Sequence, residues 1–64
     1  MNEETRATYT EVWQLHKHFH EIRKDGEWEM LIEKSNELLK RHNSEFARDL
    51  VNAMLGEIER RTHV

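Results

Sequence analysis

Cysteine and proline are both absent from this chain of 64 residues, and glycine occurs only twice. Without cysteine the protein can form neither a disulfide nor a zinc site with cysteine ligands. Domains of this size have marginal cores and usually gain stability from a disulfide, a metal ion or association with another copy. The sequence therefore leaves three sources of stability: well-packed helices, a metal bound by histidine, or self-association.

Long apolar runs and a strong charge of one sign are also missing. No stretch approaches the roughly 18 apolar residues of a membrane-spanning helix, and the acidic segment 1–4 is unlike the basic start of a signal peptide. A net charge of −3 lacks the basic surface typical of proteins that bind duplex DNA in general. We therefore expect a cytoplasmic protein that neither enters a membrane nor acts as a general DNA binder.

Apolar residues recur at spacings of three and four along most of the chain, which is the period of helices rather than strands. The lack of proline also favours long helices. We predict a single all-α domain with helices at about residues 8–24, 27–42 and 45–61, after a frayed segment 1–7. Short turns force neighbouring helices to run antiparallel, so the predicted architecture is an up-down-up three-helix bundle.

Residues with typical capping roles mark the predicted helix ends. Thr8 or Thr10 can cap the first helix with a side-chain oxygen, and Gly26 can end it in the left-handed conformation. Ser44 is the expected cap of the third helix. These positions set the predicted bounds of the three helices.

The second and third helices differ in the width of their apolar faces. The apolar residues of the second helix cover an arc of about 120°, enough for one core, and Ser35 and His42 lie on the same face. Those of the third helix cover about 200°, which is wider than a three-helix monomer needs. The third helix therefore has apolar surface to spare for association with a second chain.

Glu57 lies inside the apolar arc of the third helix. In the predicted bundle its neighbours would be His20 or Arg23 at the end of the first helix, with Arg61 one turn further along its own helix. We expect a salt bridge at the edge of the core, which stabilises little. A buried charge pair that fixes helix register or dimer geometry is the alternative.

The segment 9–22 carries two adjacent faces of the first helix. One face is an aliphatic seam for the core, consisting of Val12, Leu15, Phe19 and Ile22. The residues of the other face recur at spacings of four, three and four; they are Tyr9, Trp13, His16 and His20. Each member of this second stripe combines an apolar body with a polar tip, which suits surfaces that are buried part of the time. Packing under the third helix, a protein–protein surface and a ligand or metal site all remain open.

The histidines alone do not make a metal site. His16 and His20 could share one ion from one helix face, but His18 projects away from both. Two ligands do not hold zinc, so His42, Glu57 or a second chain would have to supply the rest. We predict no metal site and no cofactor.

Catalytic signatures are also missing from the chain. There is no cysteine nucleophile and no glycine-rich phosphate loop. Ser35 and Ser44 are better explained as a small core-facing residue and a helix cap. A helical chain of this length has little room for a deep pocket unless an oligomer supplies it. We therefore predict that the protein is not an enzyme.

Four short patterns carry a resemblance to known sequences: TEVW at 10–13, WE-x-LI at 28–32, FARDLV at 46–51 and EIERR at 57–61. Together they resemble small uncharacterised helical proteins of Firmicutes and of their phages or mobile elements. The resemblance spans roughly residues 9–61 and carries no catalytic residues. It implies a context in which small phage proteins bind and block a host protein, including defence effectors, which is an analogy of context rather than of chemistry.

Two main hypotheses follow for the function. The first is a small non-enzymatic interaction protein, a homodimer or higher oligomer, that occupies the surface of a protein partner. Its expected interaction residues are Tyr9, Trp13, His16, His20, Arg48 and Arg61. The alternative is an oligomeric module that sequesters a nucleotide-type small molecule, with an aromatic ring on the base and histidine or arginine near the phosphate. A helix-turn-helix regulator fits less well, because the second helix is acidic.

Overall fold

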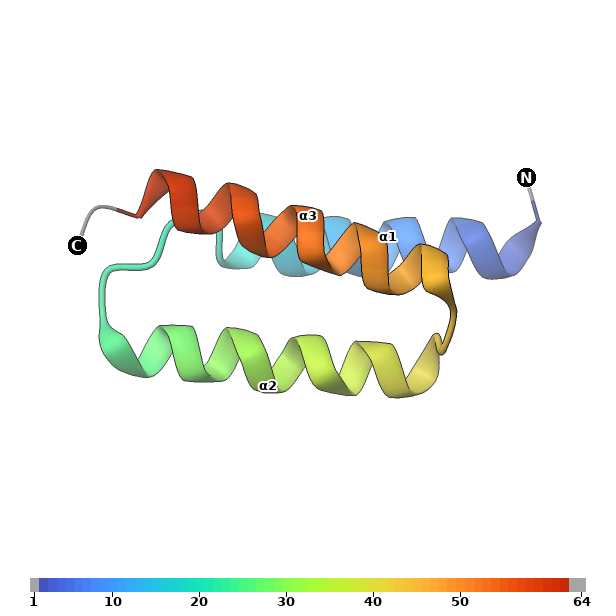
Figure 1. Cartoon of the computed structure of the whole chain (residues 1–64), viewed down its shortest axis with the longest axis horizontal. Coiled ribbons are helices and arrows are strands. Elements are labelled where there is room, and N and C mark those ends of the chain that lie inside the picture. Colours follow the sequence, from blue (N-terminus) through green and yellow to red (C-terminus); the bar gives the residue numbers. More distant parts are fainter. Residues whose placement is uncertain (1, 63–64) are drawn as a thin grey trace.

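The computed structural model describes residues 2–62 and contains three α-helices (Figure 1). They are α1 (Glu3–His18), α2 (Asp25–Arg41) and α3 (Glu45–Arg61). No strand occurs between residues 2 and 62, so the all-α prediction is confirmed. The bundle is elongated, with Cα extents of 38 × 18 × 17 Å. Across the described residues, no helix has both the length and the apolar character that crossing a membrane requires.

Helix α1 begins well before its predicted start at residue 8, because Asn2 caps it. The side-chain oxygen of Asn2 accepts a hydrogen bond from the amide of Thr5 at 2.7 Å. Acidic residues in the first turn add to this, since they face the positive end of the helix dipole. Neither predicted threonine caps the helix: Thr8 is buried within it, and its hydroxyl donates to the carbonyl of Glu4 at 2.9 Å. The predicted frayed segment is therefore helical from residue 3 onward.

Helix α1 also ends early, at His18 rather than residue 24. Phe19 leaves helical geometry and is buried in the core. The amide of Ile22 donates to the Thr62 hydroxyl at 3.2 Å instead of to a carbonyl one turn back. This hydrogen bond to a distant part of the chain gives the backbone a partner outside the helix. Residues 19–24 therefore form a connection, and the predicted helix end is wrong.

The starts of α2 and α3 follow different capping chemistry. Gly26 does not end the first helix as predicted; it lies in the first turn of α2, which begins after Lys24 without a side-chain cap. Helix α3 has the predicted bounds and the predicted cap. The hydroxyl of Ser44 accepts from the amide of Ala47 at 3.1 Å. The Ser44 cap of α3 is therefore the predicted helix cap that the structure confirms.

The core lies between the three helices and follows the predicted apolar positions. Its buried apolar residues are Val12, Phe19, Leu31, Leu38, Ala47, Val51, Met54 and Ile58. Leu15 and Ile22 of the predicted seam are half-buried and pack against this core. Ser35 is buried as the small core-facing residue that the sequence predicted, but its hydroxyl has no hydrogen-bond partner among the described residues.

Contacts near both ends of the bundle fix how the helices lie against each other. The ring of Tyr9, near the middle of α1, meets the ring of Phe46 at the start of α3, with centroids 5.0 Å apart. Arg41 at the end of α2 binds Glu11 of α1, with 2.7 Å between nitrogen and oxygen. At the opposite end, the Ile22–Thr62 hydrogen bond joins the residues that follow α1 and α3.

Two serines give opposite predictions for stability. Ser35→Ala should raise the free energy of unfolding by about 1 kcal/mol, because it removes a buried hydroxyl without a partner. Ser44→Ala, the matched control, should lower it by about 1 kcal/mol, because a helix cap is lost. Urea unfolding followed by circular dichroism measures both. A loss of stability in Ser35→Ala would mean that the hydroxyl is hydrogen-bonded in solution.

Candidate functional site

Two aromatic side chains one turn apart on α1 are exposed to solvent. Tyr9 is 45% exposed and Trp13 is 59% exposed. The ring of Tyr9 packs edge-on against Phe46, with 71° between the ring planes. The ammonium of Lys17 lies 4.7 Å from the centroid of the Trp13 ring, a cation–π contact. Contacts within the chain therefore hold both rings in place while leaving much of their surface open.

These aromatic residues belong to a larger surface, which we call the α1–α3 face. Its members are Arg6, Tyr9, Trp13 and Lys17 from α1 and Phe46, Asp49, Ala53 and Glu57 from α3. On each helix the four residues fall within an arc of about 80°. Phe46 and Glu57 are half-buried and the other six are exposed. The Tyr9–Phe46 contact places the two arcs side by side, so that they form one continuous surface.

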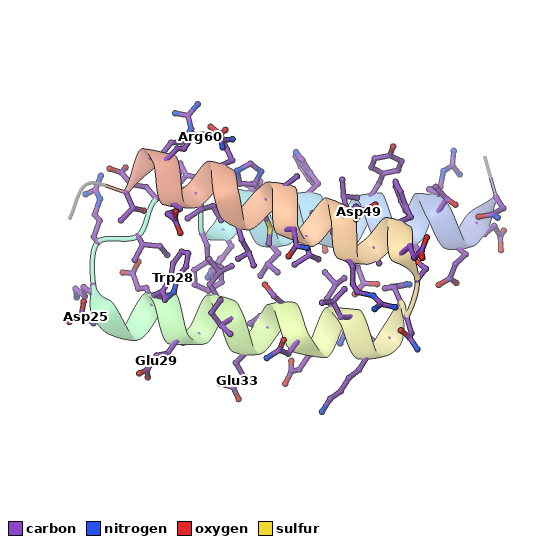
Figure 2. The ribbon with its side chains drawn as sticks, viewed as in Figure 1. Asp25, Trp28, Glu29, Glu33, Asp49 and Arg60 are labelled. Atoms are coloured by element: carbon purple, nitrogen blue, oxygen red, sulfur yellow. The ribbon has the colours of Figure 1, made fainter. Side chains whose placement is uncertain are left out.

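The α1–α3 face is turned away from α2. On α1, Trp13 lies about 160° around the helix from Glu11, the residue that binds the end of α2. On α3, Arg60, which falls within the same arc as the four face residues, extends on the side opposite α2 (Figure 2). The second helix therefore leaves this face uncovered.

The predicted interaction residues do not all lie together. Tyr9 and Trp13 share the α1–α3 face, and His16 is half-buried beside them on α1. His20 lies in the connection after α1, so the predicted stripe of four on one helix is wrong in its last member. Arg48 is exposed but lies about 160° around α3 from Phe46. It therefore belongs to a different surface of the bundle.

The two aromatic residues of the predicted stripe differ in whether they pack against the third helix. Tyr9 fits packing against the third helix in part, because its ring meets Phe46. Trp13 does not fit that interpretation, since more than half of its surface faces solvent. Phe46 was not among the predicted interaction residues, although the wide apolar arc of the third helix contained the signal for it. The structure thus joins surplus apolar surface from both helices.

Glu57 forms the edge salt bridge that the sequence predicted, but entirely within its own helix. Its carboxylate accepts from Arg60 and from Arg61, each at 2.8 Å. Hydrogen bonds from these two guanidinium groups hold the pKa of Glu57 below its usual value. Neither His20 nor Arg23 pairs with it. Arg61, predicted as a contact for a partner, is therefore engaged within the chain.

A second polar cluster joins α1 to the end of α2, and sequence reasoning missed it. Buried His42 lies between two carboxylates: Nδ1 is 2.9 Å from Glu4 Oε1, and Nε2 donates to Glu11. Arg41 donates to Glu11 through Nε at 3.1 Å and through Nη2 at 2.7 Å. Glu4 and Glu11 are two turns apart on α1 and so share one side of that helix. That spacing was the one available signal.

The charges of this cluster stabilise one another. Hydrogen bonds to Glu4 and then to Glu11 raise the pKa of His42, despite its burial. Desolvation acts to raise the pKa of Glu11, but hydrogen bonds from His42 and Arg41 outweigh it and lower the pKa overall. With a carboxylate on each ring nitrogen, the imidazolium has no free lone pair to accept a proton. The cluster therefore works as a clamp between helices rather than as a general base.

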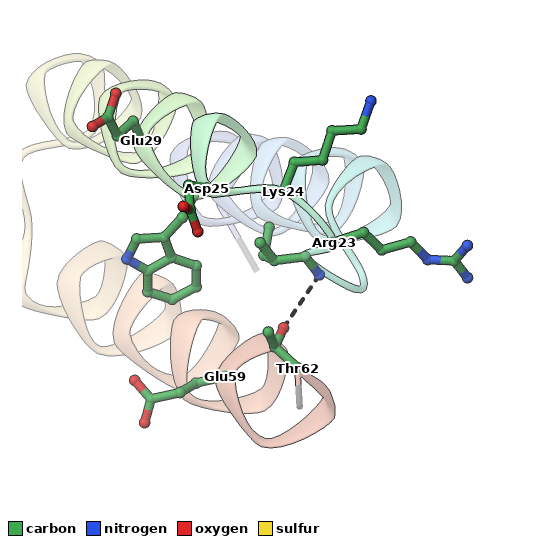
Figure 3. A pocket seen from close by; sticks show the side chains of 8 residues that line it. Arg23, Lys24, Asp25, Glu29, Glu59 and Thr62 are labelled. Carbon is green, nitrogen blue, oxygen red and sulfur yellow. Dashed lines mark hydrogen bonds between the residues drawn. The ribbon is translucent and has the colours of Figure 1, made fainter. Parts of the chain in front are cut away.

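A cleft of about 610 Å³ lies at the other end of the bundle, and Trp28 of α2 lines it. Trp28 extends from α2 toward α3 (Figure 2). Three carboxylates line the same cleft, those of Asp25, Glu29 and Glu59. The two cations, Arg23 and Lys24, extend outward from the connection (Figure 3). A phosphate placed beside the indole would therefore meet mostly negative charge.

The described residues do not bring metal ligands together. Between residues 2 and 62 there is no group of three or more histidine, aspartate or glutamate side chains placed to hold an ion. His16 and His20 no longer share one helical face, because α1 ends between them. The four-residue spacing that suggested a shared ion therefore loses its geometric basis.

The clamp predicts a pH dependence of stability. The pKa of His42 is raised, so its contribution should be complete below about pH 6.5 and should disappear as pH rises through the raised pKa. The pKa of Glu11 is lowered, so its contribution should disappear as pH falls through that lowered value. At pH 6, His42→Gln should lose about 1–2 kcal/mol of unfolding free energy relative to the natural chain.

Urea unfolding at a series of pH values measures this difference, and NMR titration locates the imidazole pKa. His20→Gln is the matched control, because His20 is exposed in the connection; we expect it to leave stability unchanged. A His42 loss that stays constant from pH 5 to pH 9 would contradict the clamp.

Comparison of the chain with protein-family models, with curated proteins and with solved structures gives no match. Support for a function therefore comes from the residues and contacts of the chain and from the sequence resemblance described above.

Proposed function

We propose that the chain is a non-enzymatic helical interaction protein that binds a protein surface through its α1–α3 face. The observation that carries this proposal is the exposure of Trp13 and Tyr9, at 59% and 45%, on adjacent turns of α1. Tryptophan and tyrosine are the residues most enriched among those that dominate binding energy at protein interfaces. Their exposure side by side favours a partner over solvent.

The contacts that the two rings make within the chain add support. Tyr9 is held by Phe46, and Trp13 is held by Lys17. Both aromatic residues stand on a regular helix rather than on a loop. A surface that is already ordered loses less side-chain entropy on binding. The face is therefore suited to bind without rearrangement.

The proposal includes an up-down-up order of the helices and association of the chain into a dimer or higher oligomer. Support for the order comes from contacts at the bundle ends. Arg41 and His42 at the end of α2 meet Glu11 and Glu4 of α1, whereas Tyr9 near the middle of α1 meets Phe46 at the start of α3. Support for association comes from the half-buried and exposed apolar residues that α1 and α3 leave outside the core.

A biological context follows from the resemblance to small proteins of Firmicutes, their phages and mobile elements. In that context the protein would act in the cytoplasm and inhibit a host protein, for example a defence protein, by covering part of its surface. The resemblance is the support for this part of the proposal.

The alternative is a module that sequesters a nucleotide-type ligand. The cleft beside Trp28 favours it, because its volume of about 610 Å³ falls within the range of small-molecule sites. The carboxylates around that cleft count against it, since they would repel phosphate. Tyr9 and Trp13, the aromatic residues first expected to stack on a base, do not line this cleft. The interaction role is therefore better supported.

The interaction role predicts that position 13 contacts a protein. A photoreactive phenylalanine analogue in place of Trp13 should give protein cross-links in the producing cells. The same analogue in place of Met30, which is 50% exposed on α2, is the matched control and should give few. Mass spectrometry of the products identifies the partner. Equal yields from the two positions, or none from position 13, would refute the assignment of the face.

The alternative function, binding of a nucleotide-type ligand, is tested by thermal unfolding. A ligand that binds the folded chain raises the melting temperature by mass action. We expect no shift across a panel of nucleoside mono-, di- and triphosphates at millimolar concentration. A rise that the Trp28→Leu variant loses would place a nucleotide in the cleft instead, and would favour the sequestering function.

A further inference from the structure

We propose that the partner of the α1–α3 face is a second copy of the same chain. The two copies would be related by a two-fold axis parallel to the helices, so that α1 of each chain packs on α3 of the other. This inference rests on the proposed function of the face and names its occupant. Three features of the chain support it: its total surface, the unlike character of its two helices, and their register.

The first feature is the amount of surface. The chain exposes 5067 Å², whereas a compact monomer of 7.8 kDa would expose about 4,400 Å². The excess of about 700 Å² is close to the 800 Å² or so that each partner buries in an interface of standard size. An elongated bundle has more surface than a sphere, so the excess alone selects no location. The exposed aromatic residues locate it on the α1–α3 face.

The second feature is that the two halves of the face are unlike. The α1 half carries the bulky rings of Tyr9 and Trp13 and is basic, with Arg6 and Lys17. The α3 half contains the small, exposed Ala53 and two carboxylates, Asp49 and Glu57, of which Glu57 is already paired with Arg60 and Arg61. A two-fold axis between and parallel to the helices brings each half onto the opposite half of the other copy. Trp13 then has the small Ala53 among its neighbours, Tyr9 meets the Phe46 ring of the other copy, and the two cations of the α1 half face the half that carries Asp49 and Glu57.

The third feature is the register of the two helices. Tyr9 and Phe46 lie at the same height along the bundle. Counting from this pair at 1.5 Å per residue, Trp13 reaches the height of residue 50, and Lys17 that of residue 54. At these heights Trp13 would lie between the partner's Asp49 and Ala53, and Lys17 would lie between the partner's Ala53 and Glu57. The same contacts occur twice, as a two-fold axis requires.

The other simple two-fold arrangement fits less well. An axis perpendicular to the helices would place α1 of one copy against α1 of the other. Arg6 and Lys17 would then face like charges, which costs free energy at an interface. The bulky Trp13 would also meet bulky residues rather than Ala53. Charge and size together therefore favour α1 on α3.

Analytical ultracentrifugation of the purified full chain tests this proposal. We expect a reversible dimer. Trp13→Ala should weaken it by about 30-fold or more, as removal of a central aromatic residue does. Ala53→Arg should weaken it similarly by blocking the space that receives Trp13. Both residues are exposed, so both variants should keep the helical circular dichroism of the natural chain. Met30→Ala, on α2, is the matched control and should dimerise normally.

An equimolar mixture of Trp13→Ala and Ala53→Arg chains gives the most decisive test of the proposed arrangement. The mixed dimer keeps one natural Trp13–Ala53 contact. In the other contact, the arginine that replaces Ala53 in one chain meets the alanine that replaces Trp13 in the other. We therefore expect the mixture to recover a one-to-one dimer that neither variant forms alone. Two variants that dimerise unimpaired, or a mixture that stays monomeric, would overturn the arrangement.

Failure of this inference is distinguishable from failure of the proposed function. A natural chain that stays monomeric at several hundred micromolar overturns the second copy as the occupant. Cross-links from position 13 to a different protein would then leave the interaction role intact. If position 13 instead cross-links only to the same chain, giving a product of twice its mass, the second copy is supported.

Discussion

A shortage of apolar side chains for the core is the constraint on which the rest of the structure depends. Three helices share a small set of buried aliphatic residues and one phenylalanine. Packing at this scale leaves little margin, because a short chain buries a small fraction of its surface. Polar contacts near the two ends of the bundle add to the stability that this small core provides. The His42 clamp ties α1 to α2 near one end, and the Ile22–Thr62 hydrogen bond joins the ends of α1 and α3 at the other.

The same shortage makes the placement of the remaining aromatic residues informative. Phe19 is buried and Trp28 packs against the core, whereas Tyr9 and Trp13 stand outside it. A chain with few large apolar residues that leaves two aromatic ones exposed gives up burial that it could have used. Covering them with a second chain recovers that burial. The two edges of α1 thus differ: carboxylates on one edge hold α2, and the aromatic rings on the other are exposed.

Local pattern predicted the elements that local chemistry controls. The three-and-four spacing located the core residues, and Ser44 marked the start of α3 because its cap needs nothing beyond the next three residues. The ends of α1 were mispredicted for two reasons. Asn2 caps α1 without any apolar periodicity behind it, and Ile22 leaves the helix to bond Thr62, forty residues away. The His42 clamp escaped prediction because its carboxylates lie more than thirty residues from the imidazole. The aromatic face was predicted at Tyr9 and Trp13 but not at Phe46, since only the packing of α3 on α1 reveals that pair.

The central claim is that a second copy covers Trp13, and the fluorescence of that residue tests it most directly. In a Trp28→Phe chain, Trp13 is the sole tryptophan, so its emission reports on this surface alone. At high protein concentration we expect emission at short wavelength and weak quenching by acrylamide. On dilution the emission should move to long wavelength and quenching should increase, with a midpoint at the dimer dissociation constant. A spectrum typical of exposed tryptophan at every concentration would contradict the account.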